Sequence, residues 1–214
     1  EVDLTEPEID LDDDNIVTND QTPIIGGTSN QPENSDVEVV LTDEDGNEVF
    51  SGITQTDTDG NWSIDSSTEG SFSGGIVELA EGNYTVKATT EDEAGNKAET
   101  TGALEVDITP PELTVDDQVT NDTTPTITGS TDEPDGSQVT VTVDGNEYTT
   151  TVEDGGWSVD IPAGNELAEG DYTVEAEITD EAGNTTTAEG SLEVDLTEPE
   201  IDLDDDNIVT NDQT

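Results

Sequence analysis

Short segments of alternating apolar and polar residues recur along the chain. A period of two places one row of side chains against a core and the other row in water, as in a half-buried β-strand. Threonine is abundant and no segment has the helical period, which favours strands over helices. The clearest alternating rows are Val37, Val39 and Leu41, then Val139, Val141 and Val143, and then Tyr172, Val174, Ala176 and Ile178.

Turn sequences rich in Gly, Pro, Asn and Asp separate these segments. They include NQPENS, DEDGN, DTDGN, LAEG and DEAGN, and they occur at short intervals. Short strands with turns at this spacing are typical of antiparallel sandwiches of about seven strands. The sequence therefore predicts an all-β fold.

The same series of motifs occurs twice. GNWSID (60–65) matches GGWSVD (155–160), LAEGNYTVKA (79–88) matches LAEGDYTVEA (167–176), and DEAGN occurs at 92–96 and 180–184. In addition, residues 1–22 recur letter for letter at 193–214. A repeat of this kind indicates an array of modules. We expect a first module at residues 1–106, a second at 107–194, and the truncated start of a third at 195–214.

The aromatic residues are interpreted as structural. Trp62 and Trp157 each begin an alternating strand after a turn, so we expect core anchors; a sugar-stacking surface is the alternative. Tyr84 and Tyr172 follow L-A-E-G at the head of a strand, the position of a tyrosine corner.

Charge narrows the classes of partner. The chain has 57 acidic residues, two lysines, no histidine and a formal net charge of -55. Nucleic acid and anionic membrane surfaces require clustered Lys and Arg, so both are excluded as partners. No apolar run is long enough to enter a membrane, and the lack of cysteine excludes disulfides and thiolate metal sites. Low hydrophobicity with high charge is also typical of disorder, but the strand patterning favours a folded chain.

Unpaired carboxylates make cations the natural partner. Clustered carboxylate oxygens suit Ca²⁺, which takes six to eight oxygen ligands in flexible geometry, better than Mg²⁺. If the sandwiches have the immunoglobulin topology, the acidic loops meet the linkers at the module junctions. Asp107 is then near the loop of Asp180 and Glu181 and faces Asp20. The predicted ligands are Asp3, Asp20, Asp92, Glu93, Asp107, Asp122, Asp180, Glu181 and Asp195. The alternative is that these Asp residues serve their turns alone; DEDGN and DTDGN are interpreted as hairpin turns.

The ordered motifs resemble a known family. D-x-T-x-P, V-T-N-D-x-T-P-x-I-x-G, D-G-N-W-S, L-A-E-G-x-Y-T-V-x-A and D-E-A-G-N are similar to the bacterial Ig-like repeats of giant calcium-dependent adhesins of the RTX and biofilm-associated kind. The resemblance implies two immunoglobulin-like β-sandwich domains, arranged end to end, with Ca²⁺ near the junctions and a parent protein at the surface of a bacterium. The positions that match the family's motifs are Asp3, Asp92, Asp107, Asp180 and Asp195. The chain departs from ordinary immunoglobulin domains in lacking the cysteine pair.

Three classes of function require different features of the sequence. We expect an extracellular structural extender, a monomeric rod segment whose partners are Ca²⁺ and neighbouring repeats and which carries a distal binding domain. The alternative is a module that binds carbohydrate, ice or a host protein, which needs an exposed aromatic or flat Thr-rich face. An enzyme is not expected, because the chain has no His, Cys or Arg and the short turns offer no evident cleft.

Overall fold

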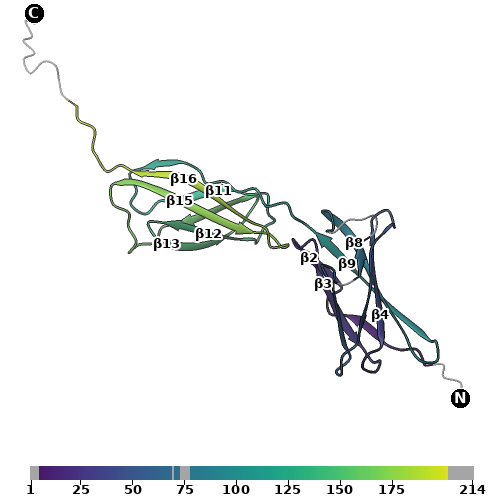
Figure 1. Cartoon of the computed structure of the whole chain (residues 1–214). Coiled ribbons are helices and arrows are strands. Elements are labelled where there is room, and N and C mark those ends of the chain that lie inside the picture. Colours follow the sequence, from purple (N-terminus) through teal and green to yellow (C-terminus); the bar gives the residue numbers. More distant parts are fainter. Residues whose placement is uncertain (1–4, 69, 73–77, 202–214) are drawn as a thin grey trace, which may run out of the picture. The chain divides into compact units, whose positions relative to one another are not determined.

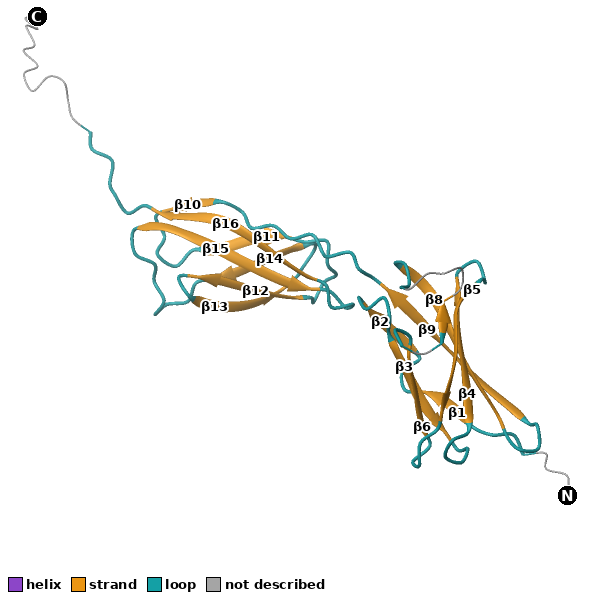
Figure 2. Cartoon of the chain, in the orientation of Figure 1, coloured by secondary structure: helices purple, strands orange, loops and turns teal. Residues whose placement is uncertain are grey.

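The described residues of the first module form nine strands in two facing sheets (Figures 1 and 2). The computed structural model describes residues 5–68, 70–72 and 78–201, and they form no helix, so none that could cross a membrane. The strands are β1 (Ile9–Leu11), β2 (Asn15–Thr18), β3 (Ile24–Ser29), β4 (Asp36–Asp43), β5 (Glu48–Gln55), β6 (Asn61–Asp65), β7 (Ser71–Phe72), β8 (Gly82–Glu91) and β9 (Lys97–Val106). One sheet has the order β1-β3-β6 and the other β2-β9-β8-β4-β5-β7.

The second module repeats this plan with fewer strands. They are β10 (Gln118–Thr120), β11 (Thr126–Ser130), β12 (Gln138–Val143), β13 (Asn146–Thr151), β14 (Gly156–Asp160), β15 (Gly170–Thr179) and β16 (Thr185–Val194). The sheets are β11-β14 and β10-β16-β15-β12-β13. The prediction of an all-β fold with two immunoglobulin-like sandwiches is confirmed.

One feature of the sheets differs from the purely antiparallel expectation. The first strand segment, β1, pairs antiparallel with β3, and the chain then crosses to the other sheet, where β2 pairs parallel with β9. The second module does the same: Leu113 bridges Thr131, and β10 runs parallel to β16. The crossing segment is rich in Asp, and it closes one edge of the sandwich.

The predicted alternation places the core. Val37, Val39 and Leu41 of β4 are fully buried, as are their counterparts Val139 and Val141 of β12. Both tryptophans are only 3% exposed, so they are core anchors and cannot serve as a sugar-stacking surface.

Both tyrosine corners are present. The Tyr84 hydroxyl donates to the carbonyl of Ala80 at 2.8 Å, and the Tyr172 hydroxyl to that of Ala168 at 3.1 Å. Each bond ties the start of a long strand to the L-A-E-G loop that precedes it. This loop is thereby held at the C-terminal end of its module, where the last strand leaves.

Contacts divide the chain into two compact units. The first contains the described residues up to Glu112 together with Ile178–Thr186, and the second contains Leu113–Glu177 and the described residues from Thr187 onward. The end of the β15–β16 hairpin thus belongs to the first unit, although the repeat assigns it to the second module. The module boundaries at 106/107 and 194/195 stay a prediction, and most of the expected third repeat, residues 202–214, lies outside the described residues.

Candidate functional site

A hydrogen-bond network surrounds Asp107 directly after β9. The Asp107 amide donates to the carbonyl of Thr18 at 2.9 Å, which continues the parallel pairing of β2 and β9. Asp107 Oδ1 accepts from the amide of Thr109 at 2.9 Å, and the Thr109 hydroxyl donates to Glu81 Oε2 at 2.8 Å. The D-x-T motif of the linker is therefore joined to the L-A-E-G loop of the module that precedes it.

The same network recurs after β16. The Asp195 amide donates to the carbonyl of Thr120 at 2.9 Å, and Asp195 Oδ1 accepts from the amide of Thr197 at 2.8 Å. The Thr197 hydroxyl donates to Glu169 Oε1 at 3.1 Å. Sequence reasoning did not assign a role to either threonine; the signal available was that both motifs recur at the same spacing.

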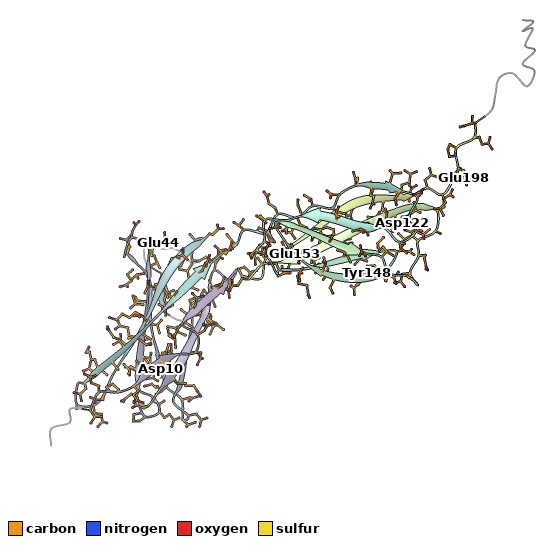
Figure 3. The ribbon with its side chains drawn as sticks, turned by 180° about the vertical axis from the view of Figure 1, so that it is seen from behind. Asp10, Glu44, Asp122, Tyr148, Glu153 and Glu198 are labelled. Carbon is orange, nitrogen blue, oxygen red and sulfur yellow. The ribbon has the colours of Figure 1, made fainter. Side chains whose placement is uncertain are left out.

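The V-T-N-D motif lies beside each linker through the strand pairing. Asp20 Oδ1 accepts from the amide of Thr22 at 2.8 Å and from its hydroxyl at 3.1 Å, and the Asp20 amide donates to Thr18 Oγ1 at 3.0 Å. Asp122 has the equivalent bonds with Thr120 and Thr124. These carboxylates are exposed, and they order the turn that follows the edge strand. Figure 3 labels Asp122 at this end of the second module.

The D-x-x-G-N sequences are tight turns in which Asn holds Asp. In DEAGN of the first module, Asp92 Oδ1 accepts from the amides of Ala94 and Asn96, each at 2.9 Å, and Asp92 Oδ2 accepts from Asn96 Nδ2 at 2.8 Å. The Asn96 side chain, followed by backbone amides of the turn, lowers the pKa of Asp92. DEDGN and DTDGN are built in the same way. DEDGN joins the paired strands β4 and β5, so the hairpin interpretation is confirmed there. It is wrong for DTDGN, because this turn carries the chain from β5 in one sheet to β6 in the other.

Asn184 connects two of the predicted ligands. Its side chain is 9% exposed, and Nδ2 donates both to Asp180 Oδ2 and to the carbonyl of Asp107, each at 2.8 Å. All three residues belong to the first compact unit. The structure therefore brings Asp107 and Asp180 together through an asparagine that sequence reasoning missed, although its position in DEAGN was visible.

A shallow acidic hollow lies at the N-terminal end of the first module. Its volume is about 1150 Å³, and residues 5–7, 30–36 and 91–94 line it. Asp92 and Glu93 are on its wall, together with Glu6, Glu33 and Asp36. Asp3, predicted to join Asp92 and Glu93, lies outside the described residues.

The donor chemistry of these loops fits a hard cation, while the ligand set is incomplete. All candidates are carboxylates, and a carboxylate has about four acceptor positions, of which the turn hydrogen bonds occupy only part. Oxygen-only donors suit Ca²⁺. Across residues 5–68, 70–72 and 78–201, however, no three acidic side chains lie close enough together to hold a metal ion.

The chain is similar to large bacterial adhesins of known structure. It is 30% identical, with a TM-score of 0.36, to a tetra-tandem repeat from the extending region of a large adhesion protein; 88% of this chain and 49% of that chain are covered. It is 26% identical, with a TM-score of 0.41, to a Ca²⁺-stabilised adhesin that helps an Antarctic bacterium bind ice; 87% of this chain and 47% of that chain are covered. It thus spans about half the length of these structures. No curated protein matches it.

The family assignment comes from the sequence itself. Residues 9–108 and 113–196 each match the bacterial Ig-like domain, and residues 71–153 also match the group 3 bacterial Ig-like domain across the two modules. The first two matches cover most of the chain, one on each sandwich. The chain therefore belongs to the bacterial Ig-like domain family.

Proposed function

We propose that this chain is an extender segment of a large bacterial surface adhesin, stiffened by Ca²⁺ bound beside the linkers. The observation that carries the proposal is that the same linker hydrogen-bond network recurs after the last strand of both modules. In both modules the residue after the last strand is an Asp, and a Thr two residues later donates to the Glu of the L-A-E-G loop. A protein selected for length needs the same linker network at every repeat, whereas a recognition site needs to occur only once.

The negative charge of the chain supports Ca²⁺ as its partner. A net charge of -55 gives strong repulsion within the chain, and the two lysines are already paired, Lys87 with Glu99 and Lys97 with Glu91. Extracellular Ca²⁺ modules commonly bind with dissociation constants of about 10⁻⁴ to 10⁻³ M. At a free Ca²⁺ concentration about tenfold above that value, each site adds roughly 1.4 kcal/mol to the free energy of unfolding.

The proposed ligands are the carboxylates nearest the linkers. Asp20, Asp107, Asp180 and Glu181 would serve the central linker, and Asp122 and Asp195 the next one. Asp3, Asp92 and Glu93 would form the equivalent set at the N-terminal end. Within these sets Asn184 has a positioning role, because its side-chain amide donates hydrogen bonds to both the Asp180 carboxylate and the Asp107 carbonyl.

The proposal also includes the cellular location of the parent protein and a role without catalysis. The parent protein would be secreted and held at the bacterial surface, with the distal binding function elsewhere. No catalytic role is proposed, because the chain has no His, Cys or Arg and its 57 carboxylates are spread along the whole sequence, so no acid–base pair stands out.

Calorimetry and small-angle scattering with and without EDTA test this function. We expect Ca²⁺ to raise the melting temperature of the 214-residue chain and to narrow its distribution of dimensions, and Mg²⁺ to do less. Asp107→Asn should reduce the Ca²⁺ response, because the amide keeps the Thr109 hydrogen bond but loses the charge. Asp171→Asn, on an exposed strand position, is the matched control. An identical melting temperature and scattering profile in Ca²⁺ and EDTA would reject the calcium part of the proposal.

A further inference from the structure

The two modules differ at one edge of the larger sheet. In the first module β7 pairs with β5, with Phe50 opposite Phe72 and Ser51 opposite Ser71. This short strand comes from the segment between the Trp and Tyr motifs that is longer in the first repeat. In the second module the sheet ends at β13, and no described strand covers it. The outer position of β13 beside β12 is visible in Figure 2.

β13 also lacks the usual protection of an edge strand. Natural edges are shielded by bulges, prolines, lysines or very short strands. β13 pairs with β12 in unbroken register from Gln138↔Thr151 to Val143↔Asn146, whereas the β4–β5 pair has a register shift between Leu41 and Thr42. Its sequence, NEYTTT, has one exposed charge, Glu147, near its start; it has no Pro or Lys and ends in three β-branched residues.

Two side-chain hydrogen bonds link β13 to elements beyond it within the described residues. Asn165 Nδ2 donates to the Tyr148 hydroxyl at 2.9 Å, and the Thr150 hydroxyl donates to the carbonyl of Ser158 at 2.6 Å. Figure 3 labels Tyr148 on this strand and Glu153 beyond its end. Thr149 and Thr151 are exposed on either side of Thr150, whose side chain is held against β14.

A groove runs beside this stretch. A hollow of about 390 Å³ is lined by Thr150, Thr151, Gly156 and Ser158, among others. It shares Thr151 and Glu153 with a second hollow of about 410 Å³ that Asp135 and Asp154 also line. The edge therefore has adjoining space for the side chains of an extended segment.

The groove has a single sign of charge. Glu153, Asp135 and Asp154 are exposed at its end, and the chain contains no Lys or Arg after Lys97. A second copy of this acidic chain would bring carboxylates against carboxylates, so it is a poor occupant. An extended segment with alternating cationic residues has complementary charge, and backbone hydrogen bonds to β13 would supply its register.

We propose that the β13 edge of the second module accepts a Lys- or Arg-containing extended segment of another protein as an added strand, with Glu153 and Asp135 facing its cations. In the first module the described part of β7 pairs with Phe50 and Ser51, which correspond to Asn146 and Glu147, so it narrows that edge to residues 53–55. This inference does not depend on Ca²⁺ or on the extender function, since it rests on the edge, the groove and the charge alone.

Hydrogen exchange of the full chain with three peptide probes tests the proposal. The probes are a peptide of alternating lysine and valine, the same peptide with N-methyl groups on alternate backbone nitrogens, and a peptide of alternating glutamate and valine. We expect the first probe, at about 0.15 M salt, to protect the amides of 149–151 and to leave Phe50 and Ser51 of β5, which pair with β7, unchanged. The N-methylated probe keeps the charge but loses ladder donors, so it should not protect β13, and neither should the acidic probe.

A double variant, Glu153→Gln with Asp135→Asn, gives the second arm. It should weaken binding of the lysine–valine peptide about fivefold, in line with the loss of two exposed ion pairs, while Glu48→Gln on β5 should leave binding unchanged. Protection that extends beyond the edge stretches 149–151 and 53–55, or equal binding of the N-methylated probe, would show unspecific attraction to a polyanion and overturn the proposal. Absence of binding by the first probe would overturn it as well.

Discussion

Gly27 on β3 lies directly opposite Trp62 on β6, and the indole occupies the space that a side chain at Gly27 would need. The second module has the same pair, Gly129 opposite Trp157. A Cβ atom at Gly27 would be 2.6 Å from Trp62 Cζ2 and 2.0 Å from the carbonyl oxygen of Asp10. The glycine is thus required by both the indole and the neighbouring backbone, in both repeats.

Gly27→Ala and Gly129→Ala should therefore destabilise their modules. The backbone oxygen cannot move away at low cost, so we expect a loss of roughly 1–3 kcal/mol, as for other overpacked cores. Gly156→Ala is the control, because the nearest atom to its added Cβ would be 3.5 Å away. Urea unfolding measures the difference; a loss in Gly156→Ala equal to that in Gly129→Ala would contradict the packing argument.

The tryptophans should tolerate phenylalanine better than their size suggests. Nε1 of Trp62 and of Trp157 is buried and has no hydrogen-bond partner among the described residues. Leaving such a donor unsatisfied costs about 1–3 kcal/mol, which Phe would relieve while losing part of the ring contacts. We expect Trp157→Phe to change the free energy of unfolding by less than about 1 kcal/mol and Trp157→Ala to lower it by about 3–5 kcal/mol. Chemical denaturation that finds the two variants equally destabilised would show that the N–H group has a partner.

The Asn of each D-x-x-G-N turn should control the titration of its Asp. Hydrogen bonds from Asn96 lower the pKa of Asp92 below its ordinary value of 3.8, so Asn96→Ala should raise that pKa. A depressed folded pKa stabilises the protein above the unfolded value, and this contribution is lost as the pH falls through the folded pKa. The stability deficit of Asn96→Ala should therefore be largest above pH 3.8 and shrink in stronger acid.

Carboxyl resonances followed by NMR, with unfolding measured at each pH, check this prediction. Asp57 is the reference carboxylate, because Asn61 lowers its pKa in the matching DTDGN turn and this shift should be the same in both proteins. A deficit that stays constant with pH would mean that Asn96 acts through backbone geometry rather than through the Asp92 charge.

Added sodium chloride should stabilise the chain. Raising the salt concentration from about 0.01 M to about 0.15 M shortens the Debye length from roughly 30 Å to about 8 Å. Because the net charge is -55 and only two lysines are available for attraction, screening removes mainly repulsion. The melting temperature in EDTA should rise with salt; a fall would mean that the two Lys–Glu pairs outweigh the repulsion.

Much of the fold was predictable because the strands follow simple rules. The alternation at Val37, Val39 and Leu41 identified a buried row, and L-A-E-G before Tyr84 identified a corner whose hydroxyl bond to Ala80 is present. The chain pairs with β3 through β1 and then crosses to pair with β9 through β2. This crossing was not predictable, because the sequences of β1 and β2 do not determine which sheet edge each segment joins. Pairing of that kind is decided by which edges the other strands leave open.

The carboxylates illustrate the same division. Their number, their position in turns and their place beside the linkers were evident from the repeat, so the sequence by itself determined an acidic, tandem, all-β chain. Only the tertiary structure decided that Asp92 and Asp180 are held by Asn96 and Asn184, and that Thr109 connects Asp107's linker to Glu81. It also decided that β7 pairs with Phe50 and Ser51 of β5, while no described strand pairs with the outer side of β13. The reason is that local patterns specify which residues form strands and turns, whereas contacts between distant residues depend on how the sheets close.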